Sequence, residues 1–208
     1  MLPIETALQF TLAAAVLSLV PGPDNLFVLM QSALRGARAG IAVTLGLCTG
    51  LVVHTLAVAF GVAALFAASA LAFTVLKVIG AAYLLYLAWG AFRAGGASAP
   101  AATAVGDAPL RLYLRGVVMN ITNPKVAIFF LAFLPQFVSA GAGPVWLQLV
   151  QLGGLFIATS LVLFCAIAGV AGRISGWLRR SPRAITLMNR LAGVVFVGLA
   201  AKLATAQR

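Results

Sequence analysis

Two charged residues lie inside otherwise apolar segments, and both follow a proline: Asp24 after Pro23 and Lys125 after Pro124. Amide side chains adjoin them, and a zwitterionic amino acid, with one ammonium and one carboxylate, would match such a group in charge and hydrogen-bonding capacity. We therefore predict a substrate-binding site made of Asp24, Asn25, Asn120, Asn123 and Lys125. The alternative is that the acid and the base only pair with each other and stabilise the fold. An ionisable residue within a membrane segment is a functional-site hypothesis by default.

Two residues are candidates for proton coupling. Apart from Glu5 at the very start of the first apolar segment, Asp24 is the only acidic residue within any such segment, so it is the natural proton carrier. His54 is the only histidine, and its alternative role is a hydrogen bond that joins two helices. Spacings of three and four predict that His54 lies on a close-packed helix face together with Gly46, Gly50, Ala57 and Gly61.

The composition places these residues in a lipid bilayer. The 208 residues are 63% hydrophobic and only 8% charged, and the mean hydropathy is +1.11. A soluble domain has about 25% charged residues, so this chain lacks the polar groups for a water-exposed surface. The net charge of +11 is not a nucleic-acid signal, because basic and aromatic residues do not alternate in runs.

A membrane-spanning helix needs roughly 20 mainly apolar residues, and the sequence contains six such segments. They are Ile4 to Leu34, Gly40 to Phe66, Leu71 to Phe92, Leu112 to Val138, Val145 to Gly172 and Ile185 to Leu203. We expect the N-terminal segment to be retained, because no Lys or Arg precedes its apolar run.

Arginines favour one orientation of these six segments. The connections after the second and fourth segments contain no Lys or Arg, and the other three are rich in Arg. Their arginines are Arg35, Arg38, Arg93, Arg111, Arg115, Arg173, Arg179, Arg180, Arg183 and Arg190. Because cytoplasmic loops are enriched in Lys and Arg, both termini are predicted to lie outside the cytoplasm.

The chain also divides into two similar halves. The first segment of each half is interrupted by a polar element with proline: Pro21, Gly22 and Pro23 in one half, and Pro124 in the other, with Asn123 as the expected helix cap. Because each half has an odd number of spans, three, the second copy must cross the membrane in the opposite orientation to the first. We predict an all-α membrane protein with a single transmembrane domain over 1–208: repeat 1 over about 1–93, a flexible loop over about 94–111 and repeat 2 over about 112–208.

Such interrupted helices at corresponding positions mark the binding sites of secondary transporters. Proline removes a backbone donor, and freed backbone groups are tolerated at membrane depth only where protein or a water-lined cavity satisfies them. The breaks are therefore expected to line a cavity. The alternative is a pair of ordinary proline kinks used only for packing.

Other functions fit the sequence less well. Cys48 and Cys165 would allow a transmembrane thiol or electron carrier, but they lie in the middle spans, away from the breaks. A heavy-metal cation exporter would need more soft or acidic ligands than these, and a purely structural subunit would leave the charged breaks unexplained. No metal cluster, phosphate-binding loop or Ser/His/Asp set is present, so we expect neither an enzyme nor a cofactor.

The motifs together resemble the LysE/RhtB family of bacterial amino-acid exporters over essentially the whole chain. They are the run from Pro21 to Asn25, Arg35-Gly36 with Gly40, Gly46 to His54, Lys77 to Leu87, and Asn120 to Lys125. The resemblance implies a multi-pass inner-membrane protein that exports amino acids or their derivatives, driven by the proton motive force. A second acid deep within a span would favour a substrate with a basic side chain. The sequence has none there, so we expect neutral substrates. The sequence is compatible with a homo-oligomer and does not determine the number of copies.

Overall fold

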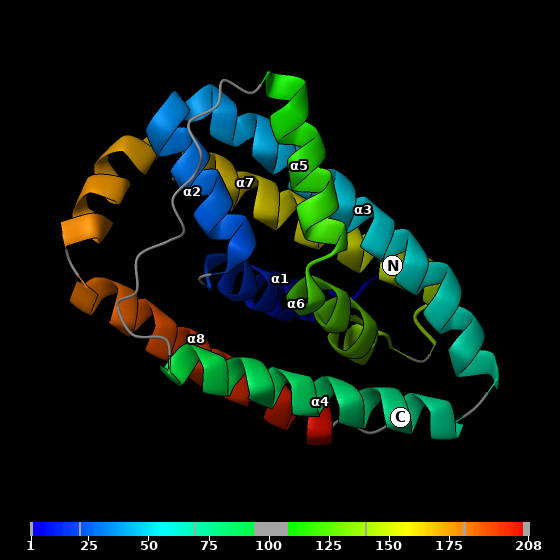
Figure 1. Ribbon diagram of the computed structural model, residues 1–208. Coiled ribbons are helices and arrows are strands. Elements are labelled where there is room, and N and C mark those ends of the chain that lie inside the picture. The colour runs from blue at the N-terminus through cyan, green and yellow to red at the C-terminus, as the bar shows by residue number, and fades with distance from the viewer. Residues whose placement is uncertain are drawn as a thin grey trace.

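The computed structural model is helical throughout residues 2–20, 22–68, 70–93, 108–139, 141–180 and 182–205, which are the residues it describes, apart from short connections (Figure 1). The α-helices are α1 (Ile4–Leu19), α2 (Pro23–Arg35), α3 (Ala37–Ala68), α4 (Ala70–Arg93), α5 (Pro109–Ile121), α6 (Pro124–Ile128), α7 (Val145–Arg180) and α8 (Pro182–Thr205). Pro21 and residues 94–107 of the predicted loop lie outside the described residues. The prediction of an all-α protein is confirmed.

Apolar length separates these helices into three kinds. Within the described residues, α3 and α7 each hold a stretch long enough to cross a bilayer alone, Ala37–Gly61 and Val145–Ala171. Two bent pairs are long enough only when taken together: α1 with α2, which meet at 60°, and α5 with the helix that follows it, which meet at 49°. Shorter apolar helices, Val78–Arg93 and Asn189–Ala201, lie within α4 and α8.

Both bends occur at the prolines that the sequence singled out. Pro23 begins α2 after Gly22, whose backbone is extended, and Pro124 begins α6 after Asn123. Proline is favoured in the first turn of a helix and disfavoured further inside, so each of these prolines starts a new helix. The predicted cap at Asn123 is confirmed, since its side chain accepts a hydrogen bond from the Lys125 backbone N–H.

The helix beyond the second break changes its winding twice. It is a π-helix at η1 (Phe129–Phe133) and a 3₁₀-helix at η2 (Leu134–Phe137). Pro135 has no backbone N–H, and its ring would clash with the carbonyl four residues earlier in an α-helix. The wider π turn before the proline avoids that clash.

The two glycines at the crossing of α3 and α5 let the helix backbones touch. A Cβ at Gly46 would lie 2.0 Å from the Tyr113 carbonyl oxygen, and one at Gly116 would lie 2.5 Å from that of Val43. Small residues allow this close approach in membrane helices.

The predicted close-packed face of α3 is wrong at Ala57 and Gly61, which are exposed. The reason is that α5 already ends at Ile121.

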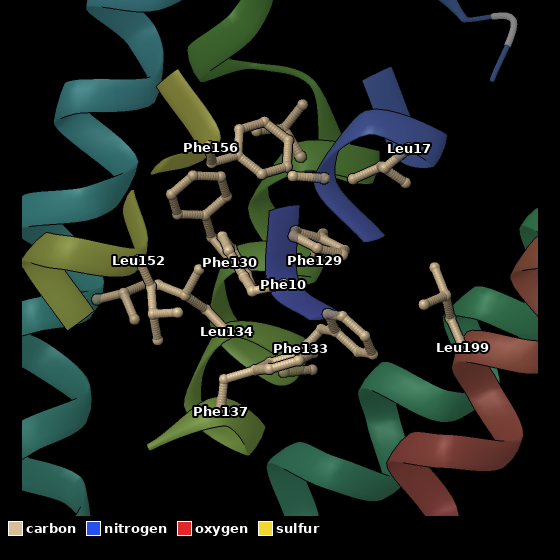
Figure 2. Close-up of a cluster of buried hydrophobic side chains, with 14 of the residues drawn as sticks. Phe10, Leu17, Phe129, Phe130, Phe133, Leu134, Phe137, Leu152, Phe156 and Leu199 are labelled. Carbon is tan, nitrogen blue, oxygen red and sulfur yellow. The ribbon is translucent and has the colours of Figure 1, made fainter. Parts of the chain in front are cut away.

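Aromatic rings of α1, η1, η2 and α7 lie in the larger of the two buried clusters among the described residues, which Figure 2 shows in close-up. Phe10 of α1 packs edge-on against Phe137 at 5.1 Å between ring centroids, and Phe129 lies 5.4 Å from Phe156 of α7. Each such aromatic pair contributes about 0.5–1.5 kcal/mol beyond area burial. The cluster therefore holds α1, which precedes the first break, against η1 and η2, which follow the second.

Candidate functional site

The carboxylate of Asp24 is held by two amides from the other half of the chain. Asp24 is the second residue of α2 and is 6% exposed. Asn120 Nδ2 donates to its Oδ2 at 3.0 Å, and Asn123 Nδ2 donates to its Oδ1 at 2.9 Å. The positive end of the α2 dipole also favours an anion here. These contacts connect the start of α2 to the break between α5 and α6.

Lys125 makes the reverse connection. Its Nζ donates to the backbone carbonyls of Leu17 and Val20, each at 3.2 Å. These carbonyls lie at the C-terminal end of α1, where carbonyls lack helical partners and the dipole is negative. A lysine at the positive N-terminus of α6 is thereby stabilised by the negative end of another half-helix. Gly22 leaves room for it, because a Cβ there would lie 3.2 Å from Nζ.

Asp24 and Lys125 face the same cavity without forming a direct ion pair among the described residues. Asp24 instead accepts hydrogen bonds from two amides of the second half, and Lys125 donates to two backbone carbonyls at the first break. The charges are close enough to interact electrostatically. Both charged groups retain capacity for a ligand, because the carboxylate can accept further hydrogen bonds and the ammonium has a third donor.

The remaining predicted side chains lie around this pair. Asn25 donates to the Ser18 carbonyl in the last turn of α1. His54 Nε2 lies 3.1 Å from the Asn120 carbonyl oxygen, and since a carbonyl only accepts, the nitrogen donates. His54 therefore contacts the second break. Asn120 connects it to Asp24, because the Asn120 backbone bonds to His54 and its side chain bonds to Asp24. Asn120 Oδ1 is buried and has no hydrogen-bond partner among the described residues.

A small cavity lies between the two breaks, α3 and α7. Its volume is about 20 Å³, which is room for about one water molecule and too little for an amino acid. The cavity is lined by Leu17, Ser18, Asp24, Asn25, Leu51, Asn120, Lys125, Val126, Phe156, Ser160 and Phe164.

Four of the five predicted binding residues line this cavity: Asp24, Asn25, Asn120 and Lys125. Asn123 does not line it; its side chain bonds to Asp24 and caps α6. His54 is outside the lining as well. Sequence reasoning missed Ser18 and Ser160, whose hydroxyls are 2.9 Å apart. The only available signal was a small polar residue within each apolar run.

The cysteines lie apart from the site. Cys48 on α3 and Cys165 on α7 are both free thiols, and neither lines the cavity. In the part of the chain that the structure describes, no group of three or more His, Cys, Asp or Glu residues could hold a metal ion. These observations give no support to a thiol carrier or to a heavy-metal site.

Comparison with known proteins then decides the family. The profile of the LysE type translocator family matches residues 15–207, which is nearly the whole chain. The chain belongs to the LysE type translocator family. It is accordingly an integral membrane transport protein and not an enzyme. No solved structure matches it.

Individual relatives of this translocator align along almost their full length. It is 35% identical to the homoserine/homoserine lactone efflux protein of Salmonella typhimurium over 95% of each chain. It is 33% identical to an uncharacterized membrane protein of Vibrio cholerae over 98% of each chain. It is 27% identical to the membrane protein YrhP of Bacillus subtilis over 96% of this chain and 98% of the relative.

Proposed function

We propose that this translocator exports amino acids or amino-acid derivatives across the bacterial inner membrane, and that the proton motive force drives the export. The observation that carries the proposal is the small cavity with a carboxylate, an ammonium and two amides in its wall, Asp24, Lys125, Asn25 and Asn120. These groups complement the two charges of a zwitterion. The efflux protein at 35% identity supports the same substrate class.

The proposed architecture is six spans in two inverted three-helix repeats. In this arrangement the bent pairs α1–α2 and α5–α6 are the interrupted first helices of the repeats, and α3, α4, α7 and α8 are the other four spans. The reciprocal contacts support it, because each break binds a charged residue that belongs to the other break. A pseudo-twofold arrangement produces such an exchange of partners.

The proposed coupling is competition for Asp24. Its carboxylate accepts either a proton or the ammonium of the substrate, and a proton would weaken its hold on the amides of Asn120 and Asn123. Release of those amides would loosen the contact between the two breaks. Because the cavity has room for about one water molecule, its walls have to move apart before an amino acid can bind.

The test is counterflow in proteoliposomes with Asp24→Asn and Lys125→Ala. We expect each substitution to abolish export of a neutral amino acid while leaving membrane insertion intact. Glu5→Gln is the matched control, because Glu5 is an exposed acid on α1 that contacts neither break. Near-normal counterflow by both site variants would overturn the assignment of the site.

Coupling has its own readout. With an imposed pH gradient, wild-type proteoliposomes are expected to accumulate substrate against its gradient, and an ionophore that collapses the pH gradient should stop this accumulation. Accumulation that persists after the collapse would refute proton coupling and leave amino-acid transport standing.

A further inference from the structure

Phe196 of α8 brings an aromatic ring to the lysine of the site. Lys125 Nζ lies over this ring, 6.0 Å from its centroid. The side chain of Phe196 is only 3% exposed. An ammonium within about 6 Å of an aromatic centroid is attracted by the negative face of the ring. The contact has no place in the function proposed so far, which uses side chains of α2, α5 and α6.

Burial distinguishes this contact from the other cation–ring contact in the described part of the chain. The Arg93 guanidinium lies 4.2 Å from the centroid of the Trp89 ring, but Trp89 is 58% exposed. The attraction between a cation and a ring is weak at exposed sites and stronger where both are desolvated. The longer contact, between Lys125 and Phe196, is therefore the one whose surroundings strengthen it.

An aromatic ring also suits the hydrogen bonding of this lysine. Lys125 Nζ donates to the carbonyls of Leu17 and Val20, which leaves its third N–H for a ligand. The ring attracts the charge as a whole and does not need that N–H. A carboxylate in the place of the ring would neutralise the ammonium and occupy the third donor. The ring therefore stabilises the ammonium and leaves it able to bind a substrate carboxylate.

The ring is held from outside the two breaks. Helix α8 packs mainly against α4 and meets α1 and η1 at few points (Figure 1). Phe196 belongs to the larger buried cluster, together with Leu199 and Ala200 of the same helix. The position of the ring is thus set by apolar packing, while its face lies at a charged group of the site. Through this contact the pair of helices α4 and α8 is connected to Lys125.

We propose that Phe196 is a positioning residue that holds the Lys125 ammonium at the cavity through a cation–π contact. Phe196 does not line the cavity, so it acts through Lys125 and not on the substrate. Its role in transport rests on the proposed export function, whereas the contact itself does not. Loss of the attraction is expected to slow export about tenfold, because the ammonium is then held less firmly at the cavity.

The experiment replaces Phe196 with phenylalanines that carry one, two or three fluorine atoms. Fluorine withdraws electrons from the ring face and changes the size of the ring little. The initial rate of export at low substrate concentration should fall with each fluorine, about tenfold over the series. A residue that only packs would keep its rate throughout. The same series at Phe27 is the matched control, because Phe27 packs against the second buried cluster and its ring contacts no cation among the described residues.

Thermal unfolding of the purified protein tests the contact without transport. The unfolding temperature should fall with each fluorine in the wild type and stay constant in Lys125→Met, since two residues that act through one contact are not additive. Lys125→Gln replaces the methionine variant if that variant does not fold. The same decline in the lysine variant, or no decline in the wild type, overturns the contact.

The two measurements also separate the positioning role from the export function beneath it. A constant export rate across the fluorine series, with a wild type that exports amino acids, overturns the positioning role and leaves export standing. A wild type that exports no amino acid overturns the export function and the positioning role together, and the unfolding series still decides whether the ring binds the ammonium.

Discussion

Gly50 is the residue whose substitution tests the contact between the two breaks most directly. It lies on α3 against the end of α5, and a Cβ placed there would be 2.6 Å from Asn120 Oδ1, 2.7 Å from its Cβ and 3.0 Å from its Cγ. Real Cβ atoms essentially never come this close to other atoms. In Gly50→Ala, the Asn120 side chain therefore has to move.

This movement of Asn120 would break its hydrogen bond to Asp24. Asn120 Nδ2 donates to the Asp24 carboxylate at 3.0 Å, and a hydrogen bond to a charged group contributes about 1.5–3 kcal/mol. At about 1.4 kcal/mol per factor of ten, loss of this bond from the transporting form predicts export slowed about ten- to hundred-fold. The protein should still insert, because one methyl group is added and no charge is changed.

The assay is initial-rate counterflow in proteoliposomes, normalised to the amount of inserted protein. Gly61→Ala is the control on the same helix, because a Cβ at Gly61 meets nothing within 4 Å, and it should retain wild-type rates. A second comparison places Gly50→Ala in an Asn120→Gly background, which removes all three clashing atoms. There the glycine substitution should have little further effect, as expected for two sites that act through one contact.

Two results would refute this reasoning. If Gly50→Ala transports at the wild-type rate, the Asn120–Asp24 bond is not needed for transport. If Gly50→Ala is equally harmful in the Asn120→Gly background, the added methyl group acts through some other contact of α3.

Two further predictions concern residues outside the cavity lining. The double variant Cys48→Ser with Cys165→Ser should export at a rate within about twofold of the wild type, because neither thiol lines the cavity; loss of export would restore the thiol-carrier hypothesis. His54→Gln should keep most of the activity, since an amide can donate to the Asn120 carbonyl as His54 does, whereas His54→Leu should lose it. A changed pH profile of export in His54→Gln would instead assign the histidine to proton transfer.

The two breaks and their charges could be predicted from the sequence because they depend on local chemistry. Proline at Pro23 and Pro124 interrupts an apolar helix wherever the chain places it, and Asn123 caps a helix through residues only two positions away. Apolar length likewise predicts the helices. The likeness of the two halves and the polar residues beside the prolines led to Asp24 and Lys125 without any tertiary information.

Long-range packing decided the rest. The sequence suggested that Asp24 and Lys125 would meet, whereas the fold gives the acid to the amides of Asn120 and Asn123 and the base to the carbonyls of Leu17 and Val20. The predicted packing face of α3 stops short because α5 ends where its own break begins.

Ser18 and Ser160 show the same division between local and long-range information. Alone, each is a small polar residue in an apolar run, for which a bond to its own helix backbone is the usual outcome. They become a pair only because α1 and α7, 142 residues apart at these positions, are packed together. Residue types and spacing determine which groups are available and where helices break, and tertiary packing alone determines which groups meet, because those contacts join residues with no local relationship in the chain.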